Sequence, residues 1–294
     1  MIPFQKIGRL VTAIFIILWT VSFAGAEEGT GVEPTPGFFV DLQSRLFKDG
    51  FDPETIRQIY AQPGVSFELK GVSLFFRHSE ARLDYDQFLQ ARRIQMARAY
   101  MMEHSGALAM TEEQYGVPGE VVTAIMLVET QLGTLVGNQT VFNILSTMAA
   151  LDDPGVRQAF WEELPKEDRL ARKAFEKKAD QKSRWAYKEL KALLHYVEAQ
   201  NMDPIIIRGS YAGAMGYCQF MPSNVLQLGV DGNGDERVDL FDHTDAIASV
   251  GNYLKHHGWK PGMTRKQQYQ VILKYNYSSP YANTILKIAD QLKG

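Results

Sequence analysis

The sequence predicts a mainly α-helical globular protein, because almost every periodic segment repeats its apolar residues at helical spacing. The chain has 294 residues, of which 45% are hydrophobic and 22% charged, and this composition argues against disorder and coiled coils. The length allows one large domain or two ordinary ones. The single cysteine, Cys218, excludes a disulfide framework, and the net charge of −3 gives no electrostatic footprint for nucleic-acid binding.

Residues 1–26 have the three parts of a secretory signal peptide: a basic start, a short apolar run and an A-x-A ending. The apolar run, residues 10–21, is shorter than the roughly 20 apolar residues that a membrane span needs. Cleavage after Ala26 would release a soluble exported protein, and an uncleaved signal anchor is the alternative. Residues 27–36 are polar and rich in proline and glycine, so they are expected to form a flexible leader.

The first helices are expected over residues 38–47 and from Pro53 onward. A long helical stretch over residues 85–115 should break near Ser105, where a serine and a glycine interrupt it. Residues 67–76 are the best candidate for a short strand pair.

Helix 118–131 has the clearest ends, with Pro118 at its start and Gly133 just beyond its last turn. The segment 152–182 is rich in charge and is predicted to form a solvated pair of helices. Further helices are expected over residues 140–151, 155–178, 183–200, 242–257, 264–275 and 281–292.

A carboxylate lies on the apolar face of helix 118–131. Glu129 follows Ile125 by four residues and Val122 by seven, so it points toward the same side as these side chains. Burial and the negative end of the helix dipole both disfavour its ionised form and raise its pKa, which suits a general acid near neutral pH. The alternative is that the helix frays at Glu129 and the side chain reaches water or a nearby arginine.

Residues 208–223 combine glycine and alanine with aromatic rings and the amide of Gln219. Small residues let a backbone approach a ligand closely, and flat aromatic faces beside amides and hydroxyls suit sugar rings. Ser210 does not lie in a G-x-S-x-G elbow, so a serine hydrolase is not indicated. A tight helix-packing loop is the alternative interpretation.

The loop that begins at Asp231 has the opening of an EF-hand calcium loop, with side-chain oxygens at positions 1, 3 and 5 and a carbonyl at position 7. These positions hold Asp231, Asn233, Asp235 and Arg237. Position 6 is Glu236 where the motif wants glycine, and position 12 is Asp242, which is shorter than the usual glutamate. A solvated turn without metal is the alternative.

Five blocks taken together resemble the lytic murein transglycosylase B family, and the resemblance runs from about Phe38 to Leu292. The blocks are VET followed by Gly133, GSYAGAMGYCQFMPS, the Asp231 loop, DAIASVGNYLKHHGW and LKYNYS. The resemblance implies a lysozyme-like catalytic domain with an N-terminal helical part at about 37–115. A core at about 116–294 would carry a small EF-hand-like calcium loop subdomain at 231–245.

The same resemblance implies a role for individual residues. Glu129 matches the single catalytic acid/base of the family, which needs no cofactor for catalysis. The positions that match substrate contacts are Ser210, Gln219, Tyr253, Tyr275 and Asn276. The positions that match ligands of a structural Ca²⁺ are Asp231, Asn233, Asp235, the Arg237 carbonyl and Asp245.

The family cleaves the β-1,4 bond between N-acetylmuramic acid and N-acetylglucosamine in peptidoglycan and leaves 1,6-anhydro ends. The resemblance therefore implies a periplasmic, monomeric lyase that acts on glycan strands, with cell-wall synthesis or division proteins as candidate partners. A lysozyme-type hydrolase and a non-catalytic peptidoglycan-binding protein of the envelope are the two alternatives.

Overall fold

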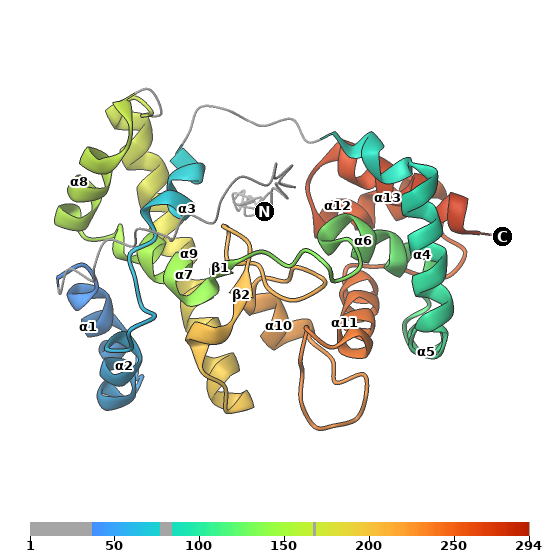
Figure 1. Cartoon of the computed structure of the whole chain (residues 1–294), viewed down its shortest axis with the longest axis horizontal. Coiled ribbons are helices and arrows are strands. Elements are labelled where there is room, and N and C mark those ends of the chain that lie inside the picture. The colour runs from blue at the N-terminus through green and yellow to red at the C-terminus, as the bar shows by residue number, and fades with distance from the viewer. Residues whose placement is uncertain (1–36, 77–83, 167–168, 294) are drawn as a thin grey trace, which may run out of the picture.

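The computed structural model describes residues 37–76, 84–166 and 169–293, and it confirms that the protein is mainly α-helical. The predicted signal peptide (1–26) and leader (27–36) lie outside the described residues. Within the described ranges, no helix is both long and apolar enough to cross a lipid bilayer. The helices form two groups, which lie on either side of a short two-stranded ribbon (Figure 1).

The first group contains the N-terminal helices and the long helix α9. Its members are α1 (Val40–Lys48), α2 (Pro53–Tyr60), α3 (Leu69–Ser73), α7 (Val141–Ala150), α8 (Pro154–Glu163) and α9 (Arg172–Gln200). All ten residues of α7 are buried, because α7 packs against α9 and also contacts α1 and α3. The Asp52 side chain accepts the Thr55 N–H and caps α2, and Pro53 occupies the first turn.

Two predictions for this group are wrong. Residues 67–76 form α3 and a 3₁₀ helix (Leu74–Phe76) instead of a strand pair, since Val72 and Phe76 lie four apart and are both fully buried on one helical face. The expected helices 155–178 and 183–200 imply a break near residue 180. The observed break falls earlier, between α8, which ends at Glu163, and α9, which begins at Arg172. Helix α9 continues through that point because Ala179 and Ser183 lie on its buried face.

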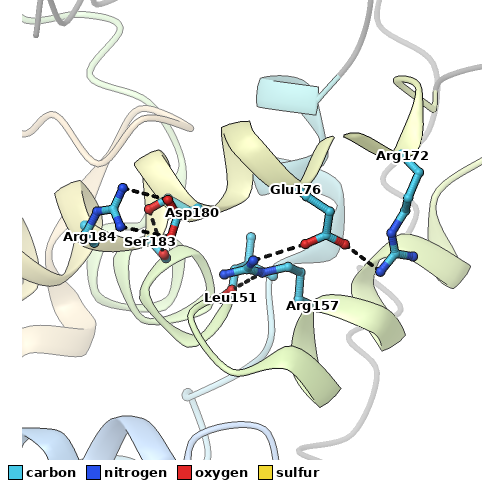
Figure 2. A network of polar contacts seen from close by, with 7 residues as sticks. All are labelled: Leu151, Arg157, Arg172, Glu176, Asp180, Ser183 and Arg184. Carbon is cyan, nitrogen blue, oxygen red and sulfur yellow. Dashed lines mark hydrogen bonds and ion pairs between the residues drawn. The ribbon is translucent and has the colours of Figure 1, made fainter. Parts of the chain in front are cut away.

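Charged side chains join α8 to α9 (Figure 2). The Arg157 guanidinium donates to the Leu151 carbonyl at the end of α7 at 2.7 Å and to Glu176 on α9 at 3.1 Å. Arg172 binds the other oxygen of Glu176 at 2.6 Å. The segment 152–182 does form two helices with many exposed residues, and this network and the buried ring of Phe160 attach it to the rest of the group.

The second group holds the catalytic candidate. Its members are α4 (Ala91–Glu103), α5 (Ser105–Tyr115), α6 (Gly119–Thr130), α11 (His243–His256), α12 (Arg265–Tyr275) and α13 (Ser279–Leu292). Helix α6 is nearly all buried and contacts α4, α5, α11 and α13. The predicted break in the stretch 85–115 is confirmed at His104, while residues Tyr85–Leu89 form a separate 3₁₀ helix.

The ribbon between the groups consists of β1 (Gln139–Thr140) and β2 (Arg208–Gly209), which pair antiparallel. Gly209 must be glycine, because a Cβ there would lie 2.1 Å from the Ala214 carbonyl oxygen. The glycine-rich loop that starts at Gly209 leads into α10 (Pro222–Leu228), a helix that the sequence analysis missed. Because α4 and α5 contact α6, the segment 37–115 contributes to both groups, and its status as a separate part stays a prediction.

Candidate catalytic site around Glu129

Glu129 lies in the last turn of α6, and only 5% of its surface is exposed. The helix does not fray at this point. The next residue, Thr130, ties the helix end down: its hydroxyl donates to the Tyr217 carbonyl at 2.7 Å and accepts the Gly133 N–H at 3.0 Å. Gln131 then turns the chain into the left-handed region, with φ +50°. The prediction that Glu129 faces the protein interior is therefore confirmed.

Among the described residues, one side chain makes a hydrogen bond to the Glu129 carboxyl. Tyr281 on α13, itself fully buried, donates its hydroxyl to Glu129 Oε1 at 2.6 Å. Burial raises the pKa of Glu129 to about 8, and the Tyr281 hydrogen bond opposes this rise only in part. Glu129 is consequently protonated at neutral pH and can donate a proton.

Two further tyrosines surround this pair. The Tyr275 ring lies parallel to the Tyr281 ring at 6.5 Å, and the Tyr85 ring meets Tyr281 edge-on at 6.2 Å. Tyr275 donates its hydroxyl to the Cys218 carbonyl at 2.5 Å, which attaches α12 to the glycine-rich loop. These aromatic rings keep water away from the carboxyl group and explain why its pKa is so high.

The predicted substrate contacts of the glycine-rich loop also hold the loop together. Ser210 Oγ accepts the N–H groups of Ala212 and Ala214, so its hydroxyl proton remains available as a donor. Gln219 Nε2 donates to the Gly216 carbonyl at 2.9 Å and to a second carbonyl in the loop after α6. The Gln219 backbone adopts φ +51°, and the side-chain oxygen of this residue remains as an acceptor.

The remaining predicted contacts lie at different depths. Asn276 follows Tyr275 at the end of α12 and is 3% exposed. Tyr253 lies one layer behind Tyr275, with the two rings 4.8 Å apart, and its hydroxyl already donates to the Lys274 carbonyl at 2.7 Å. Tyr253 therefore supports the Tyr275 ring from behind. Its hydroxyl could donate a hydrogen bond to substrate only if its bond to the Lys274 carbonyl broke.

A cation beside the glycine-rich loop was missed by the sequence analysis. Lys182 Nζ lies 4.7 Å from the ring centre of Phe75 and 4.8 Å from that of Trp185, the distance range of cation–π contacts. Burial and the nearby charge of Lys178 lower the pKa of Lys182 to about 8. The Phe75 ring in turn packs on Tyr211, the neighbour of Ser210, at 5.2 Å. The arrangement provides a half-buried ammonium group that favours an anion.

The family described as "Transglycosylase SLT domain" matches residues 36–268, well over half of the chain. The chain belongs to this transglycosylase family. It is 32% identical over 176 residues to membrane-bound lytic murein transglycosylase B of Escherichia coli (strain K12), a match that covers 60% of this chain and 41% of that protein. The chain thus spans less than half the length of that curated relative.

Two solved structures show that the transglycosylase fold is shared. The lytic transglycosylase Slt35 of Escherichia coli, solved in complex with calcium, is 21% identical, with a TM-score of 0.68 over 87% of this chain and 92% of that one. SltB3 of Pseudomonas aeruginosa, solved in complex with NAG-anhNAM-pentapeptide, is 23% identical, with a TM-score of 0.68 over 86% of this chain and 78% of that one. The predicted mainly α-helical, lysozyme-like class is confirmed.

The predicted calcium loop, residues 231–245, has the donor chemistry for a hard cation. Its side-chain oxygens hold the loop's own N–H groups: Asp231 Oδ1 accepts from Gly234 at 2.6 Å, and Asp245 Oδ1 accepts from Gly232 at 2.9 Å. Among the described residues, no three His, Cys, Asp or Glu side chains are gathered to hold a metal. The loop has oxygen donors of the kind that Ca²⁺ binds, from carboxylates, an asparagine and a carbonyl, but the structure does not gather its carboxylates around one point.

Proposed function

We propose that the protein is a peptidoglycan lytic transglycosylase that cleaves the MurNAc–GlcNAc β-1,4 bond with Glu129 as its single acid and base. The observation that carries this proposal is the buried carboxyl group of Glu129, which among the described side chains is hydrogen-bonded by Tyr281 alone; burial raises its pKa. Among the described residues, the only other buried carboxylates are those of Glu189 and Asp245. Glu189 accepts two hydrogen bonds from Ser223, and Asp245 belongs to the predicted calcium loop, where it accepts the Gly232 N–H.

In the first step, Glu129 donates its proton to the glycosidic oxygen, the bond to the muramic C1 breaks, and positive charge develops on the ring. The Tyr281 hydroxyl keeps its hydrogen bond to Oε1 and stabilises the new carboxylate. In the second step, this carboxylate takes the proton of the muramic C6 hydroxyl while that oxygen bonds to C1. The product is a 1,6-anhydro ring, no water is consumed, and Glu129 recovers its proton.

The loop residues contribute orientation. Gln219 offers its side-chain oxygen, and Ser210 its hydroxyl proton, toward sugar hydroxyl and amide groups. Lys182 offers a cation to the carboxylates of stem peptides, at the edge of the same loop. The proposed reaction, rather than the role of any one of these residues, is supported by the family match and by the anhydromuramyl ligand of SltB3, a protein with the same fold.

Product mass spectrometry on purified sacculi tests the proposal. A lytic transglycosylase releases anhydro-muropeptides, which are lighter by one water than the reducing-end products of a hydrolase. Glu129→Gln should abolish both release and turbidity loss while the protein stays folded. Reducing-end products would favour the lysozyme-type alternative, and intact sacculi with the wild-type protein would favour the non-catalytic one.

The proposal also covers the compartment in which the protein works and a bound metal ion. An exported chain acting on peptidoglycan would work in the periplasm, where we propose a monomer with cell-wall synthesis or division proteins as candidate partners. We also propose that the loop 231–245 binds a structural Ca²⁺, which is supported by its oxygen donors and by the calcium complex of Slt35. The ion would fix the loop before α11 and take no part in the reaction.

A further inference from the structure

A recess of about 560 Å³ lies between α9, α10 and the end of α1, away from Glu129. Helices α1 and α9 lie across the β1–β2 ribbon from α6 (Figure 1). The residues that give the recess its character are Phe51, Lys188, Lys191, His195 and Leu226. Its volume falls within the range of about 300–1,000 Å³ that small-ligand sites in proteins have.

The acidic side chains of this recess are already satisfied. Asp49 accepts the Lys191 ammonium at 2.6 Å, and Glu189 accepts the N–H and the hydroxyl of Ser223, both at 2.9 Å. Lys188 is exposed, and among the described residues no carboxylate lies within ion-pair distance of its ammonium group. Burial raises the pKa of the Glu189 carboxyl and the nearby charge of Lys188 opposes this rise, but the exposed ammonium group of Lys188 remains open to an anionic ligand.

Apolar surface lies next to this cation. The Phe51 ring stacks on the His195 ring at 4.8 Å, and Leu226 is 46% exposed. Lys188 and His195 are seven residues apart on α9, which corresponds to about 10 Å along the helix. An extended peptide of three or four residues spans about 10–14 Å, so a short chain with carboxylates and small apolar side chains fits both the length and the chemistry.

We propose that this recess binds the acidic stem peptide of peptidoglycan, apart from the catalytic site. The choice of ligand rests on the proposed function, because stem peptides are the short acidic peptides that such an enzyme meets. Lys188 pairs with a carboxylate of the peptide, and Phe51 and Leu226 cover its small side chains. Binding here would hold the enzyme on the wall through one strand while Glu129 acts on another.

The test is an NMR titration of the full mature chain carrying Glu129→Gln, the variant that the proposed mechanism makes inactive. The probes are a free acidic stem tetrapeptide without sugar and the same peptide with its carboxylates amidated. We expect the acidic peptide to shift the His195 ring and Leu226 methyl signals, and the amidated peptide to bind much more weakly. Adding Lys188→Glu should weaken binding about tenfold, since an attraction becomes a repulsion.

Lys177→Glu is the matched control, because it changes the same charge on an exposed position of α9 about 16 Å away along the helix. Normal binding in this control supports the proposal. Equal loss in both variants would show a general charge effect, and shifts confined to residues near Glu129 would place the peptide in the catalytic site; either result overturns the proposal, as does absence of binding. No turnover is measured, so product analysis of the wild-type enzyme tests the proposed function separately.

Discussion

The raised pKa of Glu129 predicts that this residue destabilises the protein as pH rises. In the unfolded chain the carboxyl loses its proton near its ordinary pKa of 4.5, whereas in the folded protein it keeps the proton up to about pH 8. Between these values the folded state binds more protons than the unfolded state. The free energy of unfolding must therefore fall with rising pH across this window.

The size of this effect follows from the two pKa values. One pKa unit corresponds to about 1.4 kcal/mol, so the Glu129 penalty is about 1 kcal/mol at pH 5 and about 3 kcal/mol at pH 7. Glu129 is 5% exposed, so solvent screening reduces the penalty little. Glutamine has nearly the same shape and does not titrate. Glu129→Gln should thus gain about 2 kcal/mol of stability relative to wild type on going from pH 5 to pH 7.

Urea unfolding of wild type and Glu129→Gln at pH 5, 6, 7 and 8 measures this difference. All other titrating groups are common to both proteins, and their contributions cancel in the comparison. A difference in unfolding free energy that stays the same at every pH would reflect only the changed hydrogen bond to Tyr281, and not the titration of Glu129. Parallel stability curves across this pH range would refute the claim that Glu129 is held protonated.

Four further predictions test separate parts of the structure. Tyr281→Phe removes the hydrogen bond that favours the Glu129 carboxylate, so the basic limb of the pH–rate profile should move to higher pH and the rate should fall about tenfold; an unchanged profile would contradict the role of the tyrosine. Lys182→Met should slow cleavage of peptide-bearing strands about fivefold and spare peptide-free glycans, and equal loss on both substrates would exclude a carboxylate contact. Ca²⁺ should raise the melting temperature, EDTA should reverse this rise, and Asp235→Asn should remove most of it. An equal rise in melting temperature with Mg²⁺ would argue against a calcium loop. Gly209→Ala should cost about 2 kcal/mol or more in urea unfolding, because its methyl group meets the Ala214 carbonyl; wild-type stability would show that the ribbon can relax.

The burial of Glu129 could be predicted because it depends on one helix. The positions of Val122 and Ile125 define the buried face of α6, and the helix period alone carries Glu129 onto that face. Patterns within one element are visible in a sequence because the spacing itself contains the geometry.

Contacts between distant elements could not be predicted in this way. Tyr281 lies 152 positions after Glu129, and nothing in its local pattern distinguishes it from an ordinary buried aromatic residue of an amphipathic helix. Lys182 looked like one of many charges in a solvated helix, and only the packing of Phe75 beside it shows that it is half buried. Predicting either contact would have required knowledge of how α6, α13 and α9 pack.

The most direct test of the central claim is the titration of the Glu129 carboxyl carbon by ¹³C NMR in the free enzyme, with Glu129→Gln used to assign the signal. A protonated acid in a dry tyrosine pocket predicts a titration midpoint near pH 8. A midpoint near the ordinary value of 4.5 would mean that the carboxyl is ionised at neutral pH and has no proton to donate.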